Sequence, residues 1–202
     1  VLSLWLWTPD LPRAELEARY LAEPADLRTV GPWRLHVRDS GPREAPAVLL
    51  LHGFGASLQT WDGWAQALGS GYRVVRMDLP GFGLSGPAVD GDYADAADVR
   101  RVLAVLDHLG LQSSVLVGHS MGGMTVLALA GQRPEWFEGR VIGVGLVATT
   151  AAGLAETGLT RNLQNPIIDG FRLAVRTSPG VVQHARGAAR VLITPILRAA
   201  SY

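Results

Sequence analysis

Apolar and polar residues follow several distinct patterns along this chain, and each pattern predicts a different element. Residues 47–51 are continuously apolar, which is typical of a parallel strand covered on both faces. Residues 33–39 instead alternate apolar and polar side chains, which predicts a half-buried strand in which His36 looks exposed. Similar apolar runs predict further strands at residues 72–77, 113–117 and 141–147.

The segments between these strands carry apolar residues at helical spacing. In residues 94–109, which end near His108, apolar positions recur three and four residues apart and mark one buried face. The other predicted helices are residues 12–21, which Asp10 can cap, residues 58–68 and residues 120–132. Because strands alternate with helices of this length, the sequence predicts the α/β class with a doubly wound, mostly parallel sheet.

This alternation of strands and helices stops after residue 147. The chain of 202 residues is long enough for one domain, or for one domain and an incomplete second element. We therefore expect three parts: an N-terminal segment and helix (residues 1–33), an α/β core (34–148) and a helical, irregular part broken by prolines (149–202).

The pattern Gly118-His119-Ser120-Met121-Gly122 joins the strand predicted at residues 113–117 to the next predicted helix. A serine on a sharp turn between a strand and a helix predicts a nucleophile elbow. Gly118 and Gly122 are expected where so sharp a turn leaves no room for side chains. His119 is assigned a packing or hydrogen-bonding role, since adjacent residues cannot easily face each other across an elbow.

A second motif, His52-Gly53-Phe54-Gly55, follows the buried strand at residues 47–51. Acyl transfer places negative charge on a carbonyl oxygen, and glycines let a backbone amide turn toward that oxygen. The expected donors are the backbone amides of Phe54, in this loop, and of Met121, the residue after the serine. Met121 also lies at a helix N-terminus, where the helix dipole favours anions. His52 and Gly53 are expected to shape this loop rather than to transfer protons.

Together with Asp78-Leu79-Pro80-Gly81-Phe82-Gly83-Leu84-Ser85, these motifs resemble the α/β-hydrolase fold superfamily, and especially its serine esterases and lipases. The resemblance covers residues 34–147. It implies that Ser120 is the nucleophile, that Phe54 and Met121 form the oxyanion hole, and that residues 78–85 are a structural loop beside the pocket. It also implies that residues 149–202 begin a helical cap and that no cofactor is needed.

The same resemblance implies an acid and a histidine that follow the serine in the order Ser, Asp or Glu, His. Directly after the last predicted strand, residues 148–150 contain no carboxylate. His184, Glu156 and Asp169 lie downstream of Ser120 but are weak candidates for the base and the acid. We therefore expect a truncated α/β-hydrolase fold that has little activity by itself.

Composition narrows the classes of partner. The net charge is zero and there is no basic cluster among the 18 basic residues, all arginine, which argues against nucleic acid and favours a small neutral or weakly charged substrate. The motifs above make an ester the expected small-molecule substrate. The absence of cysteine excludes disulfides and thiolate catalysis. No metal site is expected, because no His, Asp and Glu set has ligand spacing. Gly81–Gly86 matches a dinucleotide fingerprint, but the residues after it do not open a helix.

Two features bear on location and assembly. Residues 1–7 are apolar and lack an initiating Met, so they could be the remnant of a signal peptide or of a membrane anchor upstream of Val1, or could pack on the core. The compartment therefore stays open between the bacterial cytoplasm and the envelope or exterior. If the sheet ends at residues 141–147, its open edge invites self-association.

The motifs favour a serine hydrolase of carboxylic esters that works through an acyl-enzyme on Ser120. Serine at this position disfavours haloalkane dehalogenases and epoxide hydrolases, which use aspartate. Lipase, carbon-carbon hydrolase, peptidase and perhydrolase activities stay open. The alternatives are a noncatalytic protein of the same fold that binds a small ligand, or a hydrolase fragment that needs a downstream segment.

Overall fold

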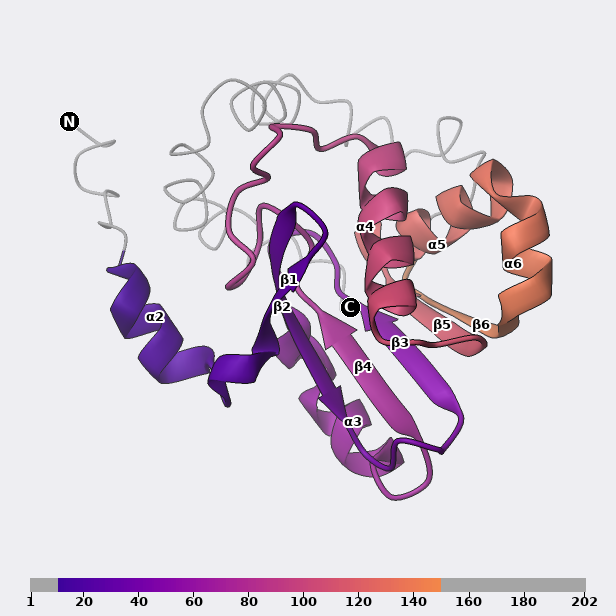
Figure 1. Cartoon of the computed structure of the whole chain (residues 1–202), viewed down its shortest axis with the longest axis horizontal. Helices are drawn as coiled ribbons and strands as arrows, with labels where there is room; N and C mark the ends of the chain where they lie inside the picture. The colour runs from indigo at the N-terminus through magenta and orange to yellow at the C-terminus, as the bar shows by residue number, and fades with distance from the viewer. Residues whose placement is uncertain (1–10, 150–202) are drawn as a thin grey trace, which may run out of the picture. The chain divides into compact units, whose positions relative to one another are not determined.

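The computed structural model describes residues 11–149, which contain a mixed sheet of six strands in the order β1-β2-β4-β3-β5-β6 (Figure 1). The strands are β1 (Leu27–Val30), β2 (Trp33–Ser40), β3 (Ala47–Leu51), β4 (Arg73–Met77), β5 (Ser114–His119) and β6 (Val141–Val147). β3, β4, β5 and β6 are parallel to one another, whereas β1 and β2 are antiparallel to their neighbours. The predicted α/β class and mostly parallel sheet are confirmed.

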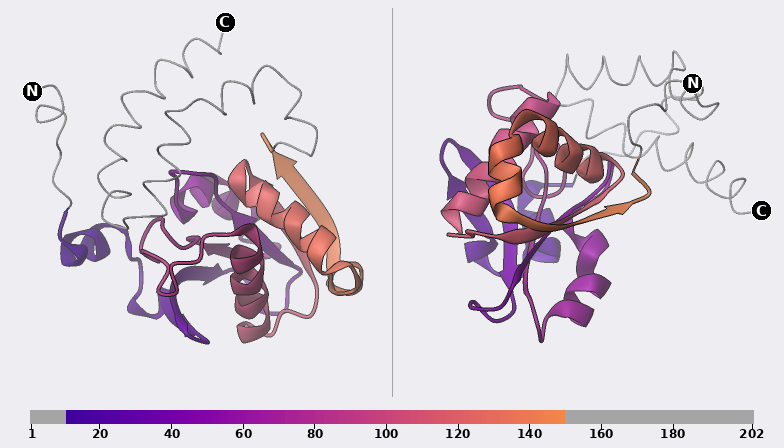
Figure 2. Two further views of the ribbon diagram at one scale, coloured as in Figure 1. Left: turned by 90° about the horizontal axis from the view of Figure 1, so that it is seen from above. Right: turned by 90° about the vertical axis from the view of Figure 1, so that its right-hand side faces the viewer.

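Helices cover both faces of this sheet. α4 (Asp95–His108) and α5 (Met121–Gln132) lie on one face, and α3 (Asp62–Leu68) lies on the other (Figure 2). The segment predicted as one helix at residues 58–68 is a 3-10 turn, η2 (Leu58–Trp61), followed directly by α3. α6 (Pro134–Arg140) leads into β6 and was not predicted from the sequence.

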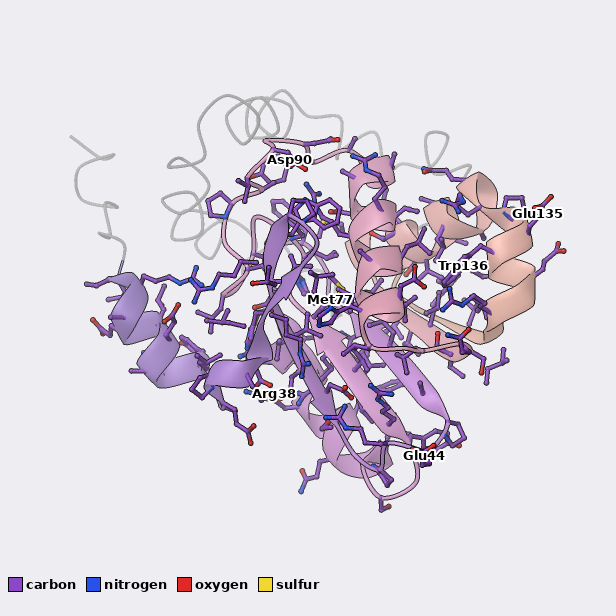
Figure 3. The ribbon with its side chains drawn as sticks, viewed as in Figure 1. Arg38, Glu44, Met77, Asp90, Glu135 and Trp136 are labelled. Atoms are coloured by element: carbon purple, nitrogen blue, oxygen red, sulfur yellow. The ribbon has the colours of Figure 1, made fainter. Side chains whose placement is uncertain are left out.

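Each face of the sheet has its own hydrophobic core. The larger core, under α4 and α5, includes Leu49, Met77 and Leu116, and Figure 3 shows Met77 in the interior of the fold. The smaller core, next to η2 and α3, includes Leu50 and Trp61. β3 supplies alternate residues to both cores, which explains why it is apolar at every position. Burying one such side chain contributes about 1.5–3 kcal/mol.

The register of the central strands brings their carboxyl ends together. Leu51 at the end of β3 pairs with Met77 of β4 on one side and with Gly118 of β5 on the other. The segments that follow these three strands therefore begin at the same edge of the sheet. In open α/β sheets this edge is where ligands bind.

The β1-β2 hairpin was not predicted. Val30 pairs with Trp33, so the turn consists of Gly31 and Pro32, and Gly31 has φ +57°. Proline fixes a negative φ at the second turn position, which leaves the type II′ turn as the one that fits. The Gly-Pro pair between two alternating segments was the signal for this hairpin.

The expectation that His36 is exposed was wrong. His36 is fully buried, and its Nδ1 lies 2.7 Å from Oδ2 of the buried Asp78. The cause is a change of partner along β2, whose first half pairs with β1 and whose second half pairs with β4. The segment after β4 is thereby placed over the side chain of His36. Alternation in the sequence does not reveal that both faces of a strand are covered.

β6 pairs with β5 alone among residues 11–149. The register shifts by one residue near Ser114 and Val115, and the apolar side chains of Ile142, Val144 and Leu146 are exposed by 64%, 46% and 45%. Self-association through this edge stays a prediction.

α2 (Arg13–Tyr20) is a short helix in which Arg13 donates a hydrogen bond to Glu17 at 2.6 Å. The predicted cap Asp10, the apolar residues 1–7 and the predicted cap segment from residue 150 onward lie outside the described residues. Of the helices within residues 11–149, none is both long enough and apolar enough to cross a membrane.

A buried arginine fastens the loop before α4 to the rest of the fold. Arg101 is fully buried and donates to Oδ1 of Asp98 at 3.1 Å, to Oδ1 of Asp90 at 2.7 Å and to the carbonyl of Asp92 at 2.7 Å. Figure 3 shows Asp90 on this loop. Trp33 of the hairpin donates to Oδ2 of Asp90 at 3.3 Å. The network therefore links α4, the loop and the β1-β2 hairpin.

This network predicts a pH dependence of stability. Burial raises the pKa of Asp98 from 3.8 to about 6, although the adjacent Arg101 charge lowers it. The folded state thus holds this proton more tightly than the unfolded chain, so the contribution of Asp98 to stability declines as pH rises from about 4 to about 6. Asp98→Asn should remove this decline, which is measured as the free energy of urea unfolding at several pH values. Asp107→Asn, an exposed change on the same helix, should keep it; an unaltered decline in Asp98→Asn would refute the assignment.

Candidate active site

Ser120 occupies a strained turn between β5 and α5. Its backbone has φ +51° and ψ −113°, a left-handed conformation that costs a residue other than glycine about 1–3 kcal/mol. The flanking glycines are tightly enclosed by backbone. A Cβ on Gly118 would lie 2.3 Å from the amide nitrogen of Gly123, and a Cβ on Gly122 would lie 2.4 Å from the carbonyl oxygen of Leu51. Neither position admits a side chain without displacing the main chain.

The end of β6 supports this turn. The amide of Ser120 donates to the carbonyl of Val147 at 2.9 Å, and the Thr149 hydroxyl lies 3.3 Å from the carbonyl oxygen of Gly118. A Cβ on Gly123 would approach the Thr149 Oγ1 to 1.9 Å. The segment after β6, where the sequence offers no carboxylate, therefore packs against the turn that holds Ser120.

The loop after β3 lies directly beside Ser120. A Cβ on Gly53 would be 3.2 Å from Cβ of Ser120 and 2.7 Å from Nδ1 of His119. Nδ1 of His119 is buried and has no hydrogen-bond partner among the described residues. The neighbouring Phe54 is 48% exposed, and its ring meets that of Phe82 edge to face at 5.5 Å. The structure thus brings both predicted motifs to one place.

Met121 is the first residue of α5. The first four amides of a helix have no partner within the helix, and they lie at its positive end. In this turn the carbonyl of Ser120 accepts hydrogen bonds from the amides of Gly123 at 3.0 Å and Met124 at 3.1 Å. The amide of Met121, next to Ser120, is one of the helix N-terminal donors that no intrahelical bond uses.

His52 is fully buried and both of its ring nitrogens are engaged by backbone. Nδ1 lies 2.8 Å from the carbonyl oxygen of Gly53, and Nε2 accepts a hydrogen bond from the amide of Leu79 at 3.0 Å. The ring also meets Phe82 edge to face at 5.5 Å. These contacts connect the loop after β3 with the loop after β4.

Asp78 is the buried centre of the loop after β4, a role that the sequence analysis did not assign. Its Oδ1 accepts from the amide of Leu58 at 2.7 Å, and its Oδ2 accepts from the amide of Leu84 at 2.8 Å and lies 2.7 Å from Nδ1 of His36. The Ser85 hydroxyl donates to the carbonyl of Asp78 at 2.7 Å. One carboxylate thereby ties β2, β4 and two loops together. The sequence signal was an aspartate directly after a buried strand and before a glycine-rich turn.

The glycine-rich segment wraps around this carboxylate. Gly81, Gly83 and Gly86 all have positive φ, at +90°, +50° and +69°. A Cβ on Gly83 would lie 1.9 Å from Oδ2 of Asp78. The next helix begins only at Asp95. The segment that matches a dinucleotide fingerprint therefore forms a turn around an internal carboxylate.

Among the described residues, no hydrogen bond joins the Ser120 hydroxyl to a histidine. His36 and His52 are bonded elsewhere, and His108 lies in the last turn of α4. Within residues 11–149 no three side chains of His, Cys, Asp or Glu gather in a group that could hold a metal ion. The other candidates for base and acid, His184, Glu156 and Asp169, lie outside the described residues.

Two known proteins are similar to this chain in sequence. The chain is 39% identical over 137 residues to the dihydrolipoyllysine-residue acetyltransferase component of the acetoin cleaving system of Pseudomonas putida, a match that spans 67% of this chain and 34% of that protein. It is 34% identical over 146 residues to a 2-hydroxy-6-oxo-6-phenylhexa-2,4-dienoate hydrolase of Burkholderia cepacia, over 70% of this chain and 46% of that enzyme. The chain thus spans less than half the length of these two relatives.

A solved structure supports the same grouping. The 2-hydroxy-6-oxo-6-phenylhexa-2,4-dienoate hydrolase of Rhodococcus sp. strain RHA1 matches with a TM-score of 0.54 at 27% identity, over 78% of this chain and 68% of that enzyme. The alpha/beta hydrolase fold family matches residues 46–172, which is more than half of the sequence. The resemblance drawn from the three motifs is confirmed, and the chain belongs to the alpha/beta hydrolase fold family.

Proposed function

We propose that this chain carries the nucleophile and the oxyanion hole of a serine hydrolase that acts on carboxylic esters. The observation that carries the proposal is the left-handed Ser120, at φ +51°, with the Gly53-Phe54 loop packed against it. A strained backbone that the surrounding structure maintains is typical of a functional position. The relatives named as hydrolases support the general class of reaction.

In the proposed reaction, Oγ of Ser120 attacks the ester carbonyl and loses its proton to a base. The carbonyl oxygen becomes negatively charged and accepts hydrogen bonds from the amides of Phe54 and Met121. The ester C–O bond then breaks, and the alcohol leaves with the proton. Water hydrolyses the acyl-enzyme and regenerates Ser120. The base and the carboxylate that orients it would come from outside residues 11–149.

A second candidate reaction is hydrolysis of a carbon-carbon bond. The compound named for two relatives, 2-hydroxy-6-oxo-6-phenylhexa-2,4-dienoate, carries a ketone and no ester. A ketone places the same demand on the site, because attack at its carbonyl also creates an oxyanion. Turnover of an aryl ester compared with turnover of this dienoate would decide between the two substrate classes.

Covalent labelling tests the nucleophile. In a parent protein whose triad is complete, we expect a fluorophosphonate to modify Ser120, because the probe forms a stable bond to an activated serine oxygen, and peptide mapping should locate the label there. Ser120→Ala should abolish the labelling, whereas Ser70→Ala, which changes an exposed serine in an ordinary turn, should not affect it. A label on another residue, or ester turnover without any label, would contradict the proposal.

Turnover by this chain tests the source of the base. Without a base, the oxyanion hole and binding leave an acceleration of about 1000- to 10,000-fold over water, so we expect weak hydrolysis of short-chain aryl esters. Ordinary turnover that His184→Ala abolishes would instead make His184 the base. A parent protein that supplies a downstream Asp and His, and still shows neither labelling nor turnover, would favour the noncatalytic, ligand-binding alternative.

A further inference from the structure

We propose that His52 is a positioning residue that aims the Phe54 amide at the substrate oxygen by holding the other end of the same peptide unit. The proposal rests on the proposed function, in which this amide is an oxyanion donor. His52 itself is fully buried and does not reach the substrate. Its effect would be carried by the backbone between Gly53 and Phe54.

The geometry of the peptide unit provides the mechanism. The carbonyl of Gly53 and the amide of Phe54 belong to one planar, trans group, so they point in opposite directions and turn together. Nδ1 of His52 lies 2.8 Å from the carbonyl oxygen of Gly53. A hydrogen bond at this oxygen therefore fixes the direction in which the Phe54 N–H points.

The backbone selects the ring tautomer that makes this bond. The amide of Leu79 can only donate, and its nitrogen lies 3.0 Å from Nε2 of His52. Nε2 must then supply a lone pair, which places the proton of the neutral ring on Nδ1. Nδ1 becomes the donor to the carbonyl of Gly53. The opposite tautomer would leave two donors facing each other at Leu79.

Further hydrogen bonds lead to the Leu79 amide. The amide of Leu79 shares its peptide unit with the carbonyl of Asp78, which accepts from the Ser85 hydroxyl at 2.7 Å. The Ser85 oxygen in turn accepts from the amide of His36 at 2.9 Å. All these hydrogen bonds run in one direction, so each polarises the next and strengthens it by about 10–30%. The relay starts at the amide of His36 in β2 and passes through His52.

The Phe54 amide is the last donor of this relay. The orientation of the Gly53 carbonyl sets the direction of the Phe54 N–H, because both belong to one peptide group. The N–H is also polarised, because the Gly53 carbonyl accepts a hydrogen bond. A purely structural role of His52 would differ in one respect. The ring would then only fill space beside Phe82, 5.5 Å away, and the side-chain donor would not matter.

Nitrogen NMR of the full chain with 15N-labelled histidine tests the tautomer directly. We expect His52 to be protonated at Nδ1 and unprotonated at Nε2, because the Leu79 amide occupies the lone pair of Nε2. A proton on Nε2 would overturn the proposal. This measurement needs no variant and no catalytic activity.

Two variants separate the donor from the acceptor. His52→Asn keeps an N–H near the position of Nδ1. The amide group of His52→Gln lies near the position of Nε2, where its oxygen can accept, and leaves no donor at the position of Nδ1. We expect His52→Gln to shift the Phe54 amide resonance and increase its hydrogen exchange, and His52→Asn to stay close to wild type. Equal perturbation of the Phe54 amide by both variants, at comparable thermal midpoints, would overturn the proposal.

Kinetics adds a functional arm. In labelling of Ser120 we expect His52→Gln to slow the reaction by about tenfold or more, without reaching the 100- to 1000-fold cost of losing a donor outright. His52→Asn should remain within about threefold. If the wild-type parent protein with a complete triad were not labelled at Ser120, the proposed function would fail, and the NMR results would still decide whether the relay exists.

Discussion

Replacing Asp78 by asparagine should lower the free energy of unfolding by about 3–5 kcal/mol, because it breaks a buried, multiply bonded carboxylate. The carboxylate accepts from the amides of Leu58 and Leu84 and is bonded to Nδ1 of His36, all in the interior. An asparagine has one acceptor oxygen, so its NH₂ group must face at least one of these donors. Each buried donor left unsatisfied costs about 1–3 kcal/mol.

Chemical denaturation of wild type and variant measures this effect. Asp107→Asn is the matched control, since Asp107 is 60% exposed and its ion pair with Arg140 lies at the surface. Exposed pairs contribute about 0–1 kcal/mol, so the control should change stability little. A similar loss of unfolding free energy in both variants would contradict the prediction, because it would show that the buried hydrogen bonds of Asp78 contribute no more than an exposed ion pair.

Gly122→Ala should destabilise the chain by about 1–3 kcal/mol or more and impair labelling of Ser120. The added Cβ would lie 2.4 Å from the carbonyl oxygen of Leu51 and 2.7 Å from that of His52. These are backbone atoms of β3 and its following loop, so they cannot move aside as a flexible side chain can. Relief requires α5 to separate from the end of β3, which moves the Met121 amide away from the Phe54 amide. Overpacking of this kind costs about 1–3 kcal/mol and sometimes more.

Gly131→Ala makes the same chemical change in the same helix. A Cβ on Gly131 would meet no atom within 4 Å. Alanine is favoured over glycine within a helix by about 1 kcal/mol, so this control should be neutral or stabilising. The contrast in thermal midpoint and in labelling rate between the two variants is the test. Equal effects would refute the steric explanation of the elbow.

Much of the sheet and of the nucleophile turn could be predicted from local patterns. β3 (Ala47–Leu51) and β6 (Val141–Val147) have the predicted bounds. β3 is buried on both faces, and such a strand must be apolar at successive positions. β6 contains a similar apolar run, although every second residue in it is exposed. The turn at Ser120 was recognisable because its constraint is local. A left-handed serine between a strand and a helix needs small residues two positions away on either side.

Short elements were harder to predict. β1 (Leu27–Val30) has four residues and pairs through a turn formed by Gly31 and Pro32. α6 (Pro134–Arg140) has seven residues, and the adjacent Trp136 and Phe137 pack, partly buried, against the core, so the helix is too short to show a periodic apolar pattern. Their positions depend on the strands beside them rather than on their own composition.

The sequence by itself determined the class of fold, the serine at the turn and the two loops that flank it. Only the tertiary structure decided that Asp78 binds His36 and that the Leu79 amide fixes the tautomer of His52. The physical reason is that β4 lies between β2 and β3, so residues far apart in the chain meet at the carboxyl ends of adjacent strands. A polar residue in an alternating pattern is expected to face water, and only its partner from another strand makes its burial favourable.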